Sequence, residues 1–438
     1  MNSTIKNDNI AKSLFHYVSF SILSMLGLSF YILADTFFIA NGVGNTGLTA
    51  LNLVIPVYTL INAIGLMLGM GGATRYSLSI GEGKKEKGHE IFSSIIILGA
   101  LIGGVFTLLG IIFSGNIVKI LGADEIIYTY AKTYLVTIVS FAVPFIVNTI
   151  VVCFVRNDGN PNLSMTAMIV GSLSNVVLDY VFIYPLNLGM FGAAFATGLS
   201  PIISLCILST HFIKKKNNFT FIRTKLSTQT LIKGILLGIP SFINEISVAI
   251  IMILFNFRIL GLVGNTGVAA YGIIANVAIV GVSIFTGIGQ GIQPLLSVNY
   301  GSKNMDNVKK IYRTGSILGI LVGLLLYTIM TLFPREIANL FATGNQELID
   351  ITVSGIRIYF LAFIIMGFNM ITCTYFAATS YSKESFLISI LRGLIFIVPF
   401  IFILPILFGI NGVWLTITCS ELLTLFVSIY YIKRKSTH

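Results

Sequence analysis

Charged residues are scarce in this chain. They make up only 10% of its 438 residues, whereas hydrophobic residues make up 55%. A soluble protein carries about a quarter of its residues as charged ones. The longest polar stretch runs only from about Lys214 to Gln229, so no soluble domain fits between the apolar segments. The composition therefore excludes a soluble globular protein and predicts a chain that crosses a membrane many times.

The residue types that most often build metal centres and catalytic sites are also few. The four cysteines and four histidines are scattered, without paired spacing and without a His-Glu-x-x-His motif. The segment Gly81-Glu82-Gly83-Lys84 does not match the longer glycine-rich pattern that binds nucleotide phosphates. We therefore expect no enzymatic activity, no cofactor, no metal centre and no disulfide.

Apolar runs recur along the whole chain, and about 20 such residues suffice to cross a bilayer as a helix. We predict an all-α polytopic membrane protein with twelve transmembrane helices. Their expected ranges are 14–40, 52–78, 91–113, 128–155, 163–184, 190–212, 233–260, 269–297, 313–333, 350–378, 385–408 and 410–432.

The net charge of +11 is explained by where the basic residues fall. Most of the 27 Lys and Arg residues lie on one side of the twelve-helix arrangement, and only Lys119 and Arg335 lie on the other. Because cytoplasmic loops carry an excess of Lys and Arg, we expect both termini in the cytoplasm. The charge reflects membrane topology, so we expect no nucleic-acid partner and a location in the cell's plasma (inner) membrane.

The two halves of the chain repeat each other. Val43-Gly44-Asn45-Thr46-Gly47 recurs letter for letter as Val263-Gly264-Asn265-Thr266-Gly267, 220 residues later, and several other glycines keep this offset. Six helices per half give both halves the same orientation, so the repeats are parallel. We predict two six-helix bundles around a central cavity: an N-lobe (1–212), a cytoplasmic linker (213–232) and a C-lobe (233–438).

Glycine pairs at helical spacing mark where helices approach closely. Gly99 and Gly103 are four residues apart, and Gly319 and Gly323 hold the equivalent positions in the second half. Such pairs let membrane helices pack against each other. We interpret them as packing positions and not as phosphate-binding loops.

Four carboxylates fall inside the predicted spans: Asp35, Asp179, Glu245 and Glu421. An ionised side chain near the bilayer centre costs about 2.5–3.5 kcal/mol on insertion scales, so each needs a reason. None of them is matched by an acid at the repeat-related position. They therefore indicate a specialisation of one half over the other and not part of the shared scaffold.

Asp35 and Asp179 lie at similar depth, each about five residues from the outer end of its predicted helix. Asn175 precedes Asp179 by one helical turn on the same face, and Thr197 lies at a comparable level in the next helix. These groups together could bind a proton or a hard monovalent cation. The alternative is that the acids only satisfy neighbouring polar groups.

Glu245, in the seventh span, could face the central cavity and attract a cationic substrate, or make a structural hydrogen bond. Arg357 and Arg392 lie deep enough in their spans to be counter-ions or contacts for an anionic substrate. Snorkelling or pairing with an acid is the simpler interpretation for both. Glu421 is open to either a functional or a structural role.

The chain resembles the multidrug and toxic compound extrusion (MATE) family, of bacterial type, over nearly its whole length. The matching segments are Leu33-Ala34-Asp35-Thr36-Phe37-Phe38-Ile39-Ala40, Ser79-Ile80-Gly81-Glu82-Gly83, Arg156-Asn157-Asp158-Gly159-Asn160-Pro161, Asn175-x3-Asp179, Gly189-Met190-x-Gly192-Ala193-Ala194, Gln290-Gly291-Ile292-Gln293-Pro294 and Asn299-Tyr300-Gly301. Their order and spacing together make the resemblance specific.

This resemblance implies two six-helix bundles that alternate access and export amphipathic, mostly cationic compounds in exchange for H+ or Na+. It places the family's cation site on Asp35, Asn175, Asp179 and Thr197, with Asn148 as a further member; bound Na+ would use the first four. Glu245 falls where some branches keep an acid, and we add Gln290, Gln293 and Arg392 to the expected substrate cavity. We expect a monomer in the lipid bilayer.

Two departures from the family pattern stand out. Span 350–378 has no aspartate beyond Asp350 at its mouth, which leaves a cation site in the C-lobe doubtful, and the first span has no proline to bend it. The main alternative function is a lipid-linked oligosaccharide flippase of the same superfamily, which would need a cationic cavity. A channel or receptor fits parallel repeats and unduplicated acids less well.

Overall fold

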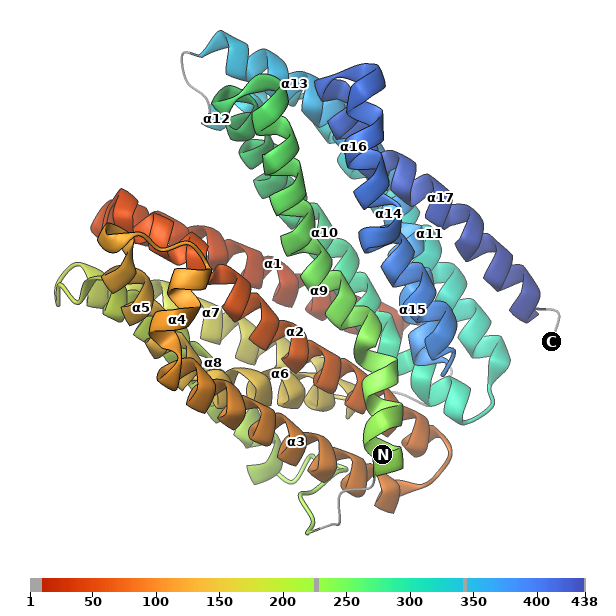
Figure 1. Ribbon diagram of the computed structural model, residues 1–438. Helices are drawn as coiled ribbons and strands as arrows, with labels where there is room; N and C mark the ends of the chain where they lie inside the picture. The colour runs from red at the N-terminus through yellow and green to blue at the C-terminus, as the bar shows by residue number, and fades with distance from the viewer. Residues whose placement is uncertain (1–9, 224–227, 342–344, 437–438) are drawn as a thin grey trace. The chain divides into compact units, whose positions relative to one another are not determined.

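The computed structural model describes residues 10–223, 228–341 and 345–436, and this part of the chain forms helices without strands (Figure 1). The elements are α1 (Ile10–Gly42), α2 (Asn45–Gly81), α3 (Lys85–Ile112), α4 (Ser114–Ile120), α5 (Glu125–Ser140), α6 (Ala142–Asn157), α7 (Pro161–Ile183), α8 (Gly189–Ile213), α9 (Thr228–Val263), α10 (Asn265–Gly301), α11 (Met305–Leu332), α12 (Pro334–Phe341), α13 (Gln346–Tyr359), the 3-10 turn η1 (Phe360–Ala362), α14 (Phe363–Ala378), α15 (Ser382–Ile390), the π-helical segment η2 (Leu391–Ile395), α16 (Ile397–Phe408) and α17 (Ile410–Ser436).

Eleven helical spans in the described residues are long and apolar enough to cross a membrane. A twelfth is the pair α5 and α6, which is bent by 48° at its junction. The bend has a local cause: Pro144, near the start of α6, has no N–H to donate to the carbonyl of Ser140, and in an unbroken helix its ring would collide with that carbonyl. The prediction of an all-α protein with twelve membrane spans is confirmed.

The eleventh span is irregular in its middle. Between α15 and α16 the chain widens into η2, where the N–H of Phe396 donates to the carbonyl of Leu391, five residues back, at 3.1 Å. Pro399 follows four residues after Ile395 and cannot donate to its carbonyl, so the regular α-helical ladder is interrupted at this point. η2 places Arg392 in this widened turn.

The sequence repeat is also a repeat of backbone structure. Gly44 joins α1 to α2 and Gly264 joins α9 to α10, with positive φ angles of 89° and 79°. Gly189, the first residue of α8, and Gly409, which directly precedes α17, have φ of 53° and 56°. Residues with a side chain rarely adopt such angles, so the repeated glycines make the same turns in both halves.

The predicted glycine packing positions are confirmed in both halves. In α3, Gly103 lies against the backbone of Val143 in α6. In α11, Gly319 lies against the backbone of Gly367 in α14, and Gly323 against that of Phe363. A Cβ atom on any of these glycines would collide with the facing helix, so the third span of each half packs on the fourth through the same device.

The chain divides into two compact units: Met1–Phe242 with Ser297–Asn304, and Ile243–Leu296 with Met305–His438. The division falls inside α9 and α10. The first part of α9 belongs to the first unit because it packs on α2 without intervening side chains; Gly238 meets the carbonyl of Met67, and Gly71 meets that of Gly234. As lobes of a transport cycle, 1–212 and 233–438 stay a prediction.

Candidate functional site

The first unit brings together four polar residues that the sequence singled out. Asp35 comes from α1, Asn175 and Asp179 from α7, and Thr197 from α8; α7 packs against both α1 and α8. All four side chains are buried, and Asn175 and Asp179 are fully so. The i, i+4 spacing in α7 therefore does place the amide and the carboxylate on one inward face.

The amide of Asn175 links α7 to α8. In one orientation its Nδ2 donates to Thr197 Oγ1 at 3.3 Å. In the opposite orientation Nδ2 donates to Asp179 Oδ2 at 3.1 Å while Oδ1 accepts from the backbone N–H of Thr197 at 3.1 Å, which satisfies both amide atoms. Either way Asn175 orients the polar cluster and is itself held in place.

The carboxyl groups of Asp35 and Asp179 lie close enough to share a hydrogen bond. Such a bond requires a proton on one of them, because two ionised carboxylates only repel. The Oδ1 atom of each is buried without a hydrogen-bond partner, and among the described residues neither acid forms a salt bridge. The pair therefore lacks the positive charge that two buried carboxylates need.

The site includes tyrosines that the sequence reasoning missed. Tyr134 of α5 is buried, hydrogen-bonds Thr197 and lies near both acids. Tyr31, one turn before Asp35 in α1, hydrogen-bonds Tyr58 of α2 at 2.9 Å between the hydroxyl oxygens. One signal was available for Tyr31, since it lies four residues before Asp35 on the same helical face. Nothing in the sequence distinguishes Tyr134 from the other tyrosines.

Asn148, the further member of the expected cation site, lies in α6. Its side-chain Oδ1 is buried and has no hydrogen-bond partner. An unsatisfied buried acceptor is uncommon in a folded protein. Its membership of the site stays a prediction.

The expected substrate residues lie in the second unit. Glu245 is in α9 and is half-buried, and Gln290 and Gln293 are buried in α10. Arg357, which was considered as a deep basic residue, is exposed near the end of α13. Their role in recognising a substrate stays a prediction.

Arg392 and Glu421 form a buried ion pair. Arg392 Nη2 and Nε both donate to Glu421 Oε1, at 2.8 and 3.1 Å, and the side chains of Arg392 and Glu421 are 11% and 3% exposed. Pairing, one of the two simpler interpretations of Arg392, is therefore what the structure shows. The positive charge of Arg392 is neutralised inside the protein.

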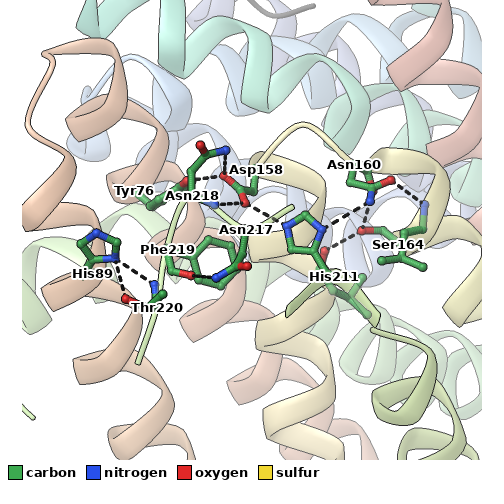
Figure 2. Close-up of polar contacts among 12 residues, drawn as sticks. Tyr76, His89, Asp158, Asn160, Ser164, His211, Asn217, Asn218, Phe219 and Thr220 are labelled. Atoms are coloured by element: carbon green, nitrogen blue, oxygen red, sulfur yellow. Dashed lines mark hydrogen bonds and ion pairs between the residues drawn. The ribbon is translucent and has the colours of Figure 1, made fainter. Parts of the chain in front are cut away.

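A second polar cluster in the first unit surrounds Asp158, in the turn between α6 and α7 (Figure 2). Asp158 Oδ1 accepts from the hydroxyl of Tyr76 and from Asn218 Nδ2, and its Oδ2 accepts from the N–H of Asn218 at 2.8 Å. His211 Nε2 lies 2.9 Å from the same Oδ2. The buried carboxylate is thus fully bonded and attaches the segment after α8 to α2 and α8.

The hydrogen bonds fix the tautomer of His211. Asn160 Oδ1 accepts from the backbone N–H of Leu163 at the start of α7, so Asn160 Nδ2 faces His211 Nδ1 at 3.3 Å. Nδ1 therefore accepts, and Nε2 carries the hydrogen that is donated to Asp158 (Figure 2). In this network both oxygens of Asp158 and both ring nitrogens of His211 have partners, which is typical of a structural role.

Part of the segment after α8, which lies in the predicted cytoplasmic linker 213–232, is docked on the first unit. Phe219 is fully buried among aromatic rings that include Tyr76, Phe92 and Phe154. The backbone N–H of Thr220 donates to His89 Nδ1 at 2.8 Å (Figure 2). A signal for this docking was present in the sequence, since Phe219 is an aromatic residue within a polar stretch.

The turn between α2 and α3 contains the segment that looked superficially like a phosphate loop. Gly83 adopts a positive φ of 82°, and Lys84 Nζ donates to Glu82 Oε2 at 2.8 Å. This hydrogen bond lowers the pKa of the Glu82 carboxyl below its usual value. The segment is a charged surface turn in which Lys84 is bonded to Glu82.

The donor set around Asp35 and Asp179 consists of carboxylate, amide and hydroxyl oxygens. Such oxygen donors suit a proton or a hard cation such as Na+ and do not suit soft metals. The buried, unpaired carboxylate oxygens are the groups that a bound cation would satisfy.

Comparison with known proteins gives consistent matches. A sequence profile described as MatE matches residues 21–181 and 240–403. The multidrug export protein MepA of Staphylococcus haemolyticus is 24% identical over 430 residues, covering 98% of this chain and 94% of that protein. MepA of Staphylococcus aureus (strain MRSA252) is 23% identical over 418 residues, covering 94% and 91%.

Solved structures share the fold. An outward-facing multidrug resistance MATE family transporter of the MOP superfamily superimposes with a TM-score of 0.93 at 24% identity, covering 99% of this chain and 97% of that one. A MOP superfamily transporter from Pyrococcus furiosus, described as having a binding pocket of reverse polarity, gives a TM-score of 0.91 at 23% identity, with the same coverage.

Proposed function

Because the chain belongs to the MatE family of membrane transporters and is not an enzyme, we propose that it exports small amphipathic organic compounds in exchange for a cation. The similar MepA proteins are multidrug export proteins, which supports a broad range of small organic substrates. The observation that carries the proposal is the buried Asp35–Asp179 pair, which has unsatisfied carboxylate oxygens and no basic partner.

The coupling cation is H+ or Na+, bound at Asp35 and Asp179 and assisted by Asn175 and Thr197. A carboxyl pair in a low-dielectric site is stable only when a cation reduces its negative charge. Binding and release of that cation therefore change the local charge on the face that α1 presents to α7. We propose that this change in charge alters how α1 packs on α7, and that the altered packing drives the switch between inward-open and outward-open states.

Substrate recognition is assigned to the second unit. The half-buried carboxylate of Glu245 attracts cationic substrates, and the amides of Gln290 and Gln293 add polar contacts. We propose a monomer in the plasma membrane. Both termini lie in the cytoplasm on this proposal, as the distribution of Lys and Arg predicts.

The flippase alternative is weakened by the structure of the second unit. That function requires free positive charge to hold a pyrophosphate group. Arg392 is bonded to Glu421, and Arg357 is exposed near the end of α13. Neither arginine supports a buried cationic site.

The experiment is dye transport in proteoliposomes. We expect ethidium to accumulate against its gradient when a pH or Na+ gradient is imposed, and the effective gradient names the coupling ion. Asp35→Asn should abolish this transport, while Asp306→Asn, the same change at an exposed position in the first turn of α11, should leave it intact. Full transport by Asp35→Asn would overturn the assignment of the cation site.

A further inference from the structure

Arg392 joins three helical elements of the second unit at the irregular turn η2. Two of its nitrogens donate to Glu421 of α17, and the third, Nη1, donates to Asn244 Oδ1 of α9 at 3.3 Å. A guanidinium group can serve both partners because its nitrogens point in different directions within one plane. Arg392 therefore connects α17 to α9 through a single side chain.

The acid end of this network is fully satisfied. Glu421 Oε2 accepts from Asn369 Nδ2 of α14 at 2.8 Å, and Asn369 Oδ1 accepts from Ser428 Oγ at 3.0 Å. The hydroxyl of Ser420 also donates to the carbonyl of Arg392 at 3.2 Å. The network has no free charge to offer a substrate, so Arg392 has a different task from the one first expected of it.

A second contact holds α9 at the same place. Gly393, next to Arg392, lies so close to Ser247 that a Cβ atom on it would collide with the serine side chain. Asn244 and Ser247 are three residues apart in α9 and share one face of that helix. The turn η2 therefore contacts α9 at two successive positions on this face, which fixes the rotation of α9 about its axis.

Glu245 directly follows Asn244 in α9. Successive residues of a helix point about 100° apart, so the contact at Asn244 also decides where the Glu245 carboxylate points. Glu245 is half-buried, and among the described residues it forms no salt bridge. Its direction is set by the docking of its neighbour and not by a partner of its own.

We propose that Arg392 is a positioning residue: by bridging Glu421 and Asn244 it sets the rotation of α9 and aims the Glu245 carboxylate at a cationic substrate. The inference rests on the proposed role of Glu245 in substrate recognition. It replaces a direct contact between Arg392 and the substrate with an action through α9.

The test uses Asn244→Ala, which removes the hold on α9 and leaves the Arg392–Glu421 pair intact. Transport kinetics in proteoliposomes should show KM for ethidium, a permanent cation, raised about fivefold, because the Glu245 carboxylate is no longer held toward the cation and part of their attraction is lost. The kcat value should change little. KM for chloramphenicol, which carries no charge, should stay the same.

A double-mutant cycle with Glu245→Gln separates positioning from general loosening of the fold. In the Glu245→Gln background, Asn244→Ala should cause no further rise in KM for ethidium, because no carboxylate is left to aim. Arg392→Lys, which keeps the pairing charge but loses the planar fork, should reproduce the Asn244→Ala kinetics in both backgrounds.

Three results are informative in different ways. An equal rise in KM in both backgrounds, or for both substrates, would overturn the positioning role and leave Glu245 as a substrate contact. The same holds if Asn244→Ala changes nothing while Glu245→Gln raises KM. If Glu245→Gln itself leaves KM unchanged, the role of Glu245 and the inference fail together, whereas gradient-driven transport would still support cation-coupled export.

Discussion

Each unit of this protein buries carboxylates inside membrane-length helices, but Asp35 and Asp179 of the first unit and Glu421 of the second are bonded in opposite ways. In the first unit, Asp35 and Asp179 face each other, and the described residues give them no positive partner. In the second, Glu421 receives two hydrogen bonds from Arg392 and another from Asn369. The comparison shows that a position inside the membrane does not by itself make an acid functional. The groups bonded to the acid determine whether it is free to bind a cation.

The physical consequence is that the two kinds of acid differ in whether their charge is available to bind a cation. A buried acid with a bonded arginine is compensated by the protein itself, and removing either member leaves an uncompensated charge. A buried acid without such a partner is compensated only when a cation binds from solution. The first arrangement suits a permanent structural contact between helices, and the second suits binding of an exchangeable ion.

The comparison is tested most strongly by removing one charge from the ion pair. Glu421→Gln leaves Arg392 buried without its counter-ion, so the free energy of unfolding should fall by about 3–5 kcal/mol. Unfolding of the detergent-solubilised protein by denaturant titration would measure this loss. An unchanged stability would mean that Arg392 finds another partner or water, and the contrast between the units would weaken.

Removing the whole pair should cost far less. In Arg392→Met with Glu421→Leu, apolar side chains of similar size replace both charges, and such replacements are often neutral or stabilising by about 1–4 kcal/mol. The same titration should therefore show the double variant to be more stable than Glu421→Gln. A double variant as unstable as the single one would indicate that packing and not charge explains the loss.

In the first unit the same kind of change should have the opposite effect. Asp179→Asn removes a charge that has no partner, and the amide can still hydrogen-bond Asp35, so stability should be unchanged within about 1 kcal/mol or rise. Gradient-driven ethidium transport should be lost all the same. A large loss of stability would make Asp179 a structural residue like Glu421.

The smallest effect is expected at the hydroxyl that the sequence reasoning missed. Tyr134→Phe removes one hydrogen bond to Thr197 and should cost about 1 kcal/mol of stability. Its transport should become weaker without being abolished, because the two acids remain. Tyr130→Phe, the same change at an exposed position in α5, is the matched control.

Much of this architecture could be predicted from the sequence. The bilayer sets the length of each spanning helix, and the repeat shows which residues of the two halves correspond. The glycines at 44 and 264 and at 189 and 409 make equivalent turns because both halves follow the same backbone path. Asp35, Asn175, Asp179 and Thr197 could be grouped because helical spacing and depth are readable from a sequence. Their neighbour Tyr134 could not, since which helix packs beside α8 is a tertiary property.

The partner of Arg392 could not be assigned for a related reason. Its direction depends on η2, an interruption that a sequence pattern does not show, and its acid comes from a different helix. Phe219 is visible as an aromatic residue within the polar linker, but the sequence does not show which rings it packs against. In both cases the missing information is which surfaces meet, and composition and periodicity do not contain it.

If Asp35 and Asp179 bind the exchanged cation, as proposed, movement of that ion depends on both acids. Proteoliposomes containing a trapped pH-sensitive or Na+-sensitive dye should report a cation flux when an ethidium gradient is imposed across the membrane. We expect this flux to run opposite to ethidium and to disappear in the double variant Asp35→Asn with Asp179→Asn. A coupled flux that persists in this double variant would contradict it and place the cation elsewhere in the protein.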